Sequence, residues 1–147
     1  MNRKRHSGFT LLELLVVLVL MGLITGMAVP LLSSGLPGAQ LKASARELLA
    51  GLRQARDQAI TLRQDAALTI DVQKHAFQVS GNPRVYKLPA KVKIGLFVAD
   101  TQAAGDVGAF RFYPDGSSTG GRVTVSLDRT TYQIDVDWLT GMARLQD

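Results

Sequence analysis

The sequence contains no cysteine and only two histidines among its 147 residues. The lack of thiols excludes a disulfide framework, a thiolate metal site and a cysteine nucleophile. His6 lies in the basic N-terminus and His75 in a predicted turn, so a histidine metal site or a catalytic triad lacks its residues. We therefore expect a protein with no catalytic site, no metal and no cofactor.

Charge is missing from one long stretch near the N-terminus. No charged side chain occurs between Glu13 and Lys42, and Leu14–Leu32 is a nearly unbroken apolar run. About 20 apolar residues are enough for a helix that crosses a bilayer. The run predicts a single membrane-spanning helix. The basic residues 3–5 would stay in the cytoplasm, so the rest of the chain would lie outside it.

The excess of positive charge is small once the N-terminus is set aside. Without Arg3, Lys4 and Arg5, fourteen basic residues face twelve acidic ones, and the formal net charge falls from +5 to +2. A strongly basic binding surface needs more than this. Nucleic acid is therefore not an expected partner.

Glu13 distinguishes the apolar run from an ordinary anchor. An acidic residue at the centre of a membrane helix costs about 2.5 to 3.5 kcal/mol, so a retained one indicates a function. A secretory signal peptide cut after Gly26-Met27-Ala28 is one alternative, but its apolar core would exceed the usual length and contain the acid. A plain signal anchor is a second alternative, and it leaves Glu13 unexplained.

The stretch G-F-T-L-L-E at residues 8–13 resembles the class III leader of type IV pilins and pseudopilins. The resemblance implies that a prepilin peptidase cuts between Gly8 and Phe9 and methylates the new amine of Phe9. The apolar segment then stays in the protein. Glu13 would neutralise the amine of a neighbouring subunit and act as an assembly register, because two paired charges in hydrocarbon are less unfavourable than one alone.

Two helical segments are predicted before the chain changes its pattern. Pro30 should kink or locally melt the apolar helix, unless that helix simply ends near Pro30 before a linker at residues 33–38. An amphipathic helix follows, with apolar residues at helical spacing. Its predicted buried stripe is Leu41, Ala45, Leu48, Leu52, Ala55, Ala59 and Leu62. If the leader is removed, one long helix could run from Phe9 to about Arg63.

Beyond Asp65 the apolar period falls to two, which predicts about eight short strands. The order of the segments predicts an α+β fold, in which a long N-terminal helix packs on antiparallel sheet. Ala99–Gly108 is expected to be a mobile loop. Trp138 is expected in the core, and Asp135 and Asp137 on the exposed face of an edge strand.

Two motifs in the C-terminal half give a more specific resemblance. They are F-Y-P-D-G-S-S-T-G-G at residues 112–121, read as a structural turn and not as a ligand loop, and W-L-T-G at residues 138–141. Together with the leader they resemble the GspH-type minor pseudopilins of type II secretion, which have a type IV pilin-like fold. The resemblance implies a cleaved leader (1–8), an apolar transmembrane and assembly segment (9–38), an amphipathic helix (39–64) and a periplasmic β head (65–147).

By the same resemblance the chain sits in the bacterial inner membrane and joins the pseudopilus near its tip. Its implied partners are other minor and major pseudopilins, the prepilin peptidase and the inner-membrane assembly platform. A FimT-like minor pilin that binds DNA for uptake is the main alternative, and an anchored periplasmic enzyme is another. The DNA alternative would use four arginines as phosphate contacts: Arg111, Arg122, Arg129 and Arg144.

Overall fold

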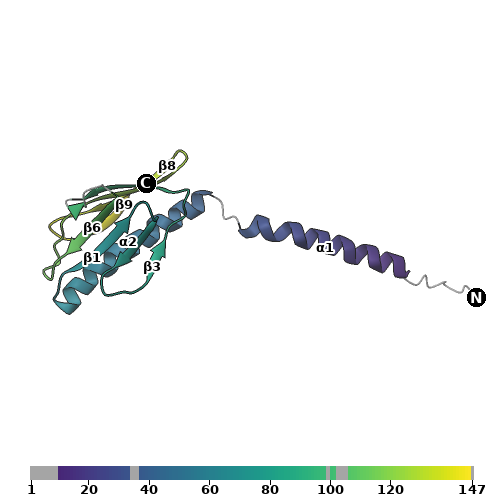
Figure 1. Ribbon diagram of the computed structural model, residues 1–147, viewed down its shortest axis with the longest axis horizontal. Coiled ribbons are helices and arrows are strands. Elements are labelled where there is room, and N and C mark those ends of the chain that lie inside the picture. Colours follow the sequence, from purple (N-terminus) through teal and green to yellow (C-terminus); the bar gives the residue numbers. More distant parts are fainter. Residues whose placement is uncertain (1–9, 34–36, 99, 102–105, 147) are drawn as a thin grey trace, which may run out of the picture. The chain divides into compact units, whose positions relative to one another are not determined.

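The computed structural model describes residues 10–33, 37–98, 100–101 and 106–146, with residues 25–33, 37 and 100–101 described for their backbone alone. Gly8 and Phe9 lie outside the described residues. The chain divides into two compact units, Met1–Gly35 and Leu36–Asp147. The first contains helix α1 (Leu11–Ser33), and the second, the head, contains all other elements (Figure 1).

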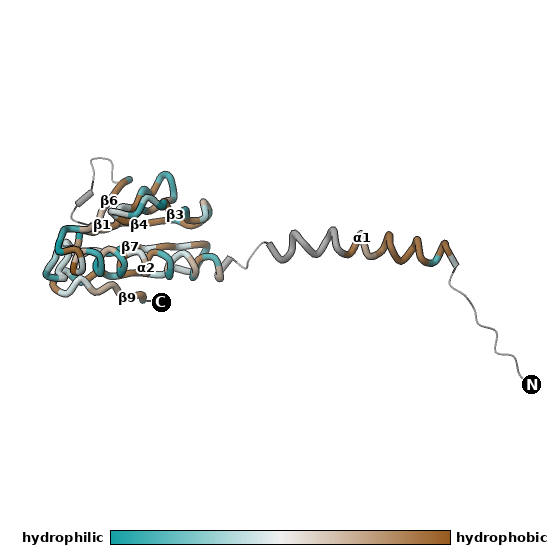
Figure 2. Tube along the Cα trace, turned by 90° about the horizontal axis from the view of Figure 1, so that it is seen from below, coloured by the Kyte–Doolittle hydropathy of each residue, from teal (hydrophilic) through white to brown (hydrophobic). Residues whose placement is uncertain are grey.

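Helix α1 is apolar on every side. Its one charged residue is Glu13, in the first turn, and the coloured part of its trace is mostly brown, for hydrophobic residues, in Figure 2. Backbone hydrogen bonding of the helical kind continues past Pro30 to Ser33. In the part of the chain that the structure describes, no helix combines the length and the apolar character that a bilayer-crossing helix requires.

Helix α2 (Pro37–Leu62) is amphipathic, as predicted. It opens on Pro37, at a position where the missing N–H has no partner to lose. Six of the seven predicted stripe residues are completely buried: Leu41, Ala45, Leu48, Leu52, Ala55 and Ala59. The prediction was wrong for Leu62, whose exposed fraction is 57%.

The end of α2 explains the exposure of Leu62. Arg63 has a φ of 53°, the left-handed conformation that ends a helix. The Gln64 N–H then donates to the Ala59 carbonyl over 3.3 Å, in the pattern of a Schellman C-cap. Because the chain turns away at Arg63, Leu62 lies at the helix end and is not covered by the sheets.

Within the described residues of the head, nine strands form two antiparallel sheets. The five-stranded sheet has the order β3-β2-β1-β6-β5 and the four-stranded sheet the order β4-β7-β8-β9. The strands are β1 (Ala66–Asp71), β2 (Ala76–Val79), β3 (Val85–Lys87), β4 (Lys93–Val98), β5 (Asp100–Thr101), β6 (Val107–Phe112), β7 (Gly121–Leu127), β8 (Thr130–Val136) and β9 (Ala143–Gln146).

The core of the head lies between α2 and both sheets. Helix α2 contacts β1, β2 and β6 of one sheet and β7, β8 and β9 of the other, and Figure 1 shows it running along the strands. The buried residues of α2 form one hydrophobic cluster with strand residues such as Phe110 and Val123. Helix and sheet lie close together at Gly51, where an added Cβ would lie 2.8 Å from Leu68 Cδ1 and 2.9 Å from Phe77 Cε2.

Two expectations for the strand region need correction. The predicted loop at Ala99–Gly108 is shorter, because Asp100 and Thr101 form β5 and pair with Ala109 and Gly108 of β6. The second correction concerns Trp138, which was expected in the core and has an exposed fraction of 67%. It follows β8 in a turn whose hydrogen bonds direct it outward.

Candidate assembly site

The first turn of α1 is fixed by a side-chain cap. Thr10 precedes the helix, and its Oγ1 accepts a hydrogen bond from the Glu13 N–H over 3.2 Å. Thr10 and Glu13 have the spacing of a capping box, in which the N-cap hydroxyl satisfies the third backbone N–H. A carboxylate is also favourable in the first turn because of the positive end of the helix dipole. Glu13 is therefore held on an ordered turn and is exposed to solvent.

Beyond Glu13, α1 presents a continuous apolar surface. Each of its large apolar side chains from Leu11 to Ile24 is exposed, with fractions that range from 46% at Val17 to 84% at Leu11. A helix that is hydrophobic all round is normally buried in a core, a membrane or an assembly. This surface is much larger than the scattered apolar side chains of a typical monomer surface.

The four predicted site residues differ in how far the structure describes them. Gly8 and Phe9, at the predicted cleavage point, lie outside the described residues. Pro30 is placed within α1, and the kink expected there stays a prediction. Glu13, the acidic residue that the leader motif indicated, lies in the capped first turn of α1.

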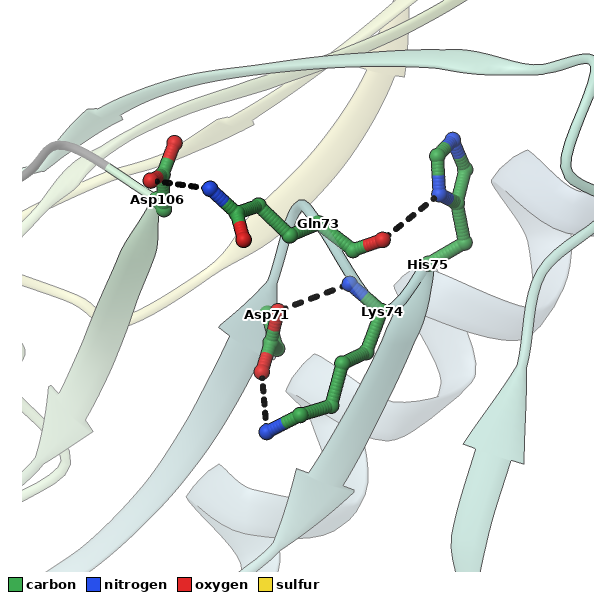
Figure 3. A network of polar contacts seen from close by, with 5 residues as sticks. All are labelled: Asp71, Gln73, Lys74, His75 and Asp106. Carbon is green, nitrogen blue, oxygen red and sulfur yellow. Dashed lines mark hydrogen bonds and ion pairs between the residues drawn. The ribbon is translucent and has the colours of Figure 1, made fainter.

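His75 lies in the β1–β2 turn, and the polar contacts around it hold this turn in place. In Figure 3 the β1–β2 turn is closed by Asp71, which accepts from the Lys74 N–H over 2.8 Å and pairs with Lys74 Nζ over 2.9 Å. Gln73 Nε2 donates to Asp106 Oδ2 over 2.7 Å and so ties the turn to the start of β6. The hydrogen bonds from the Lys74 backbone and side chain hold the pKa of Asp71 below its usual value.

Within the described ranges, no group of three or more metal-binding side chains occurs. His75 Nδ1 lies 3.3 Å from the Gln73 carbonyl oxygen.

The loop at residues 113–121 is a structural turn, as predicted. Asp115 Oδ1 accepts from the Ser117 hydroxyl over 2.6 Å and from the Ser117 N–H over 2.9 Å, which lowers the pKa of Asp115. Gly120 has a φ of 68°, and an added Cβ there would lie 2.9 Å from Trp138 Cβ. Glycine at this position therefore lets the backbone lie directly against Trp138.

Asp137 organises the second motif. Its Oδ1 accepts from the Leu139 N–H, the Thr140 N–H and the Thr140 hydroxyl, over 3.0, 2.8 and 3.0 Å. The Thr140 N–H is the main cause of the lowered pKa of Asp137. The spacing of Asp135 and Asp137 was read as exposed alternation on an edge strand. That was wrong, because β8 lies between β7 and β9 and Asp137 caps the following turn.

Asp135 belongs to a cross-strand ion pair. Arg122 of β7 and Asp135 of β8 are direct partners in the register, and Arg122 Nε lies 2.5 Å from Asp135 Oδ1. The arginine, followed by Gln133, holds the pKa of Asp135 below its usual value. One of the four arginines considered as a phosphate contact is therefore already paired within the head.

Family models match both regions just described. The model for the type II transport protein GspH covers residues 44–140, and the model for the prokaryotic N-terminal methylation motif covers residues 3–29. The chain belongs to the GspH family. The second match includes Gly8, Phe9 and Glu13, so this GspH-family chain carries the prepilin methylation motif that the leader had indicated.

A curated relative supports the assignment over nearly the whole chain. The type II secretion system protein H of Xanthomonas campestris pv. campestris is 33% identical over 143 residues, covering 97% of this chain and 84% of the relative. The prediction of a GspH-type minor pseudopilin of type II secretion is confirmed. Pseudopilins are structural proteins and not enzymes. A prepilin-type N-terminus implies anchoring in the inner membrane.

Solved structures confirm the pilin-like α+β fold. The minor pseudopilin EpsH from the type 2 secretion system of Vibrio cholerae is similar with a TM-score of 0.58 at 14% identity, over 73% of this chain and 96% of that chain. The type IV minor pilin FimU of Pseudomonas aeruginosa is similar with a TM-score of 0.58 at 15% identity, over 74% and 90%. Because both give the same score, the fold alone does not separate secretion from pilus proteins.

Proposed function

We propose that this GspH-family chain is a single-pass inner-membrane subunit with a periplasmic head, which is cut between Gly8 and Phe9 and joins the pseudopilus near its tip. The observation that carries the proposal is the structure of helix α1. One acidic residue sits on a capped helical turn, and an exposed apolar helix surface follows it. Such a surface needs lipid or other subunits around it.

Glu13 is the residue that makes the helix an assembly element and not only an anchor. No charged residue follows it until Lys42. Removing the leader would create an ammonium on Phe9, and the amine of one subunit would meet the Glu13 carboxylate of the next. Each charge would be strongly unfavourable in an apolar fibre without the other.

The first experiment is Glu13→Gln in the full chain, expressed with the rest of its secretion system. Cleavage and membrane insertion should be unchanged, whereas recovery in sheared pseudopili should fall at least tenfold. Glu47→Gln, a matched change at an exposed acid of α2, should be recovered as the natural chain is. Natural recovery of the Glu13 variant would refute the assembly role of this residue.

Mass spectrometry of the mature chain tests the processing step. A methylated Phe9 at the N-terminus is expected. A chain that starts at Val29 would instead indicate a signal peptide cut after Ala28, and the proposal would fail.

The alternative of a DNA-binding pilus subunit makes a different prediction. It requires a mobility shift of duplex DNA at physiological salt by the full chain in detergent. We expect no shift even at low salt, because the net charge without the leader is only +2 and Arg122 is paired with Asp135. A shift that weakens steeply as salt rises would favour the alternative.

A further inference from the structure

Two hollows on the head meet at the W-L-T-G turn. The larger, of about 650 Å³, lies over the four-stranded sheet and is lined in part by Phe97, Trp138 and Arg144. The smaller, of about 390 Å³, lies between α2 and the turn and is lined in part by Arg53, Arg56 and Arg144. Met142 and Arg144 line both hollows, so they form one continuous surface, here called the turn surface.

The turn that carries this surface is held from several sides. The Gly141 N–H donates to the Asp137 carbonyl over 2.9 Å, and the Asp137 N–H donates to the Met142 carbonyl over 3.0 Å. The Ser118 N–H donates to the Trp138 carbonyl over 2.8 Å, and Arg56 Nε donates to the Thr140 carbonyl over 2.9 Å. The turn is therefore preorganised, and a partner need not order it on binding.

The rigid turn displays large apolar side chains to solvent. Trp138 is 67% exposed, Met142 48% exposed, and Phe97 of β4, which lines the same hollow as Trp138, 80% exposed. Aromatic residues and methionine are enriched at protein interfaces, and tryptophan is among the residues that most often dominate binding energy. Nothing in the packing of the head requires these side chains to be apolar.

The charge of the smaller hollow is positive. Its charged lining residues are three arginines and one aspartate, Asp57. Arg56 uses its Nε on the turn, but within the described part of the chain the Arg53 side chain makes no hydrogen bond and no ion pair. Arg144 lines the same hollow and is attracted to Asp137. The guanidinium group of Arg53 is therefore open to an external carboxylate, and Arg144 adds positive charge beside it.

We propose that the turn surface docks an acidic segment of another pseudopilin head, with a carboxylate between Arg53 and Arg144 and an apolar side chain against Trp138. The inference rests on the proposed function, because it requires neighbouring pseudopilins. A carboxylate matches the arginines by charge and by bidentate geometry. A DNA backbone fits less well, because an exposed apolar cluster lines the larger hollow.

The test measures binding of the full chain, in detergent micelles, to each purified full-length pseudopilin of the same secretion system. For one of these partners, Arg53→Glu and Trp138→Ala should each weaken binding at least tenfold. Arg53→Lys should weaken binding less than Arg53→Glu does, since lysine keeps the charge but loses the bidentate fork. Arg53 is exposed on α2 and Trp138 on its turn, so both variants should fold, which hydrogen exchange of the head strands checks.

Arg129→Glu is the matched control, because Arg129 is exposed in the β7–β8 turn and lines neither hollow. It should bind as the natural chain does. Equal binding by Arg53→Glu and the natural chain would overturn the proposal, as would an equal loss in Arg129→Glu. The proposal would also be overturned if Arg53→Glu weakened binding only to a second copy of this chain, or only to duplex DNA.

These outcomes separate the two proposals. If the natural chain enters pseudopili but Arg53→Glu binds every pseudopilin normally, the turn surface is wrong and the proposed function stands. If the natural chain is never recovered in pseudopili, the proposed function fails, whatever the binding assay gives.

Discussion

The two long helices of this chain solve the burial of apolar residues in opposite ways. Helix α2 concentrates apolar side chains on one stripe and completely buries six of its seven residues against the two sheets. Helix α1 is apolar on every side and leaves its described side chains exposed. Figure 2 shows the contrast, with mixed colours along α2 and brown along the described part of α1.

The difference locates the partner of each helix. The partner of α2 is the rest of its own head. The sequence of α2 fits that surface, with Gly51 where the helix lies against Leu68 and Phe77. The surface of α1 is apolar on every side, which is typical of helices surrounded by lipid or by other subunits. Substitutions in α2 should therefore affect stability, whereas substitutions in α1 should affect assembly.

The largest expected effect on stability comes from truncating the buried stripe. Leu52→Ala should destabilise the head by about 2 to 5 kcal/mol, because Leu52 is completely buried and its removal leaves a cavity. The measurement is hydrogen exchange of the amides of β1 and β7, in the full chain in detergent micelles.

Leu18→Ala in α1 is the matched control. Leu18 is 62% exposed, so the head should keep its stability within about 0.5 kcal/mol. A similar loss in both variants would mean that α1 contributes to the folding of the head, and the contrast between the helices would be wrong.

Replacing one glycine by alanine in each helix tests the same difference with a single added methyl group. Gly51→Ala should destabilise the head by about 1 to 3 kcal/mol through overpacking, since the new Cβ would press on Leu68 and Phe77. In α1, a Cβ added at Gly22 would meet no atom within 4 Å among the described residues, apart from its chain neighbours and the backbone of its own helix. Gly22→Ala should therefore stabilise the helix by about 0.5 to 1 kcal/mol. Thermal unfolding followed by circular dichroism measures both, and opposite signs are the expected result.

The sequence predicted those features that depend on local pattern. The α2 stripe follows from helical spacing, and the predicted hairpin at residues 68–79 follows from alternation around a turn. The leader motif indicated Glu13, but the capping bond from Glu13 to Thr10 was not foreseen, although the capping-box spacing was there to find.

Features set by contacts distant in the sequence were missed. The two residues of β5 form a strand only because β6 lies beside them. Trp138 is exposed because Ser118, distant in the sequence, binds its carbonyl and fixes the turn. The exposure of Phe97 likewise depends on which face of β4 meets the core. The period of apolar residues in the sequence predicts which residues of a strand alternate between its two faces. It does not predict which segments meet in the fold, so the turn surface could not be predicted from it.

Acid should destabilise the head through four aspartates, since the pKa values of Asp71, Asp115, Asp135 and Asp137 are all lowered from the usual 3.8. The folded head therefore takes up protons less readily than the unfolded chain. Stability from these groups is complete above the unfolded pKa and is lost as the pH falls through the folded values. Unfolding in urea should be constant from about pH 7 to 5 and easier below about pH 4.

Asp137→Asn checks the cause of this acid sensitivity. The variant keeps a carbonyl acceptor for the turn but loses the titrating charge, so its stability should depend less on pH below about 4. An unchanged acid profile in Asp137→Asn would assign the sensitivity to the other three aspartates.

The smallest effect is expected at the start of α1. Thr10→Ala removes the acceptor of the Glu13 N–H and should cost the first turn about 0.5 to 1 kcal/mol. Faster hydrogen exchange at the Glu13 amide would report the loss, and Thr10→Ser should restore slow exchange because serine keeps the hydroxyl. The head should be unaffected in both variants. If Thr10→Ala leaves the Glu13 amide as protected as before, the turn is fixed by something other than this cap, and Glu13 would not owe its position to Thr10.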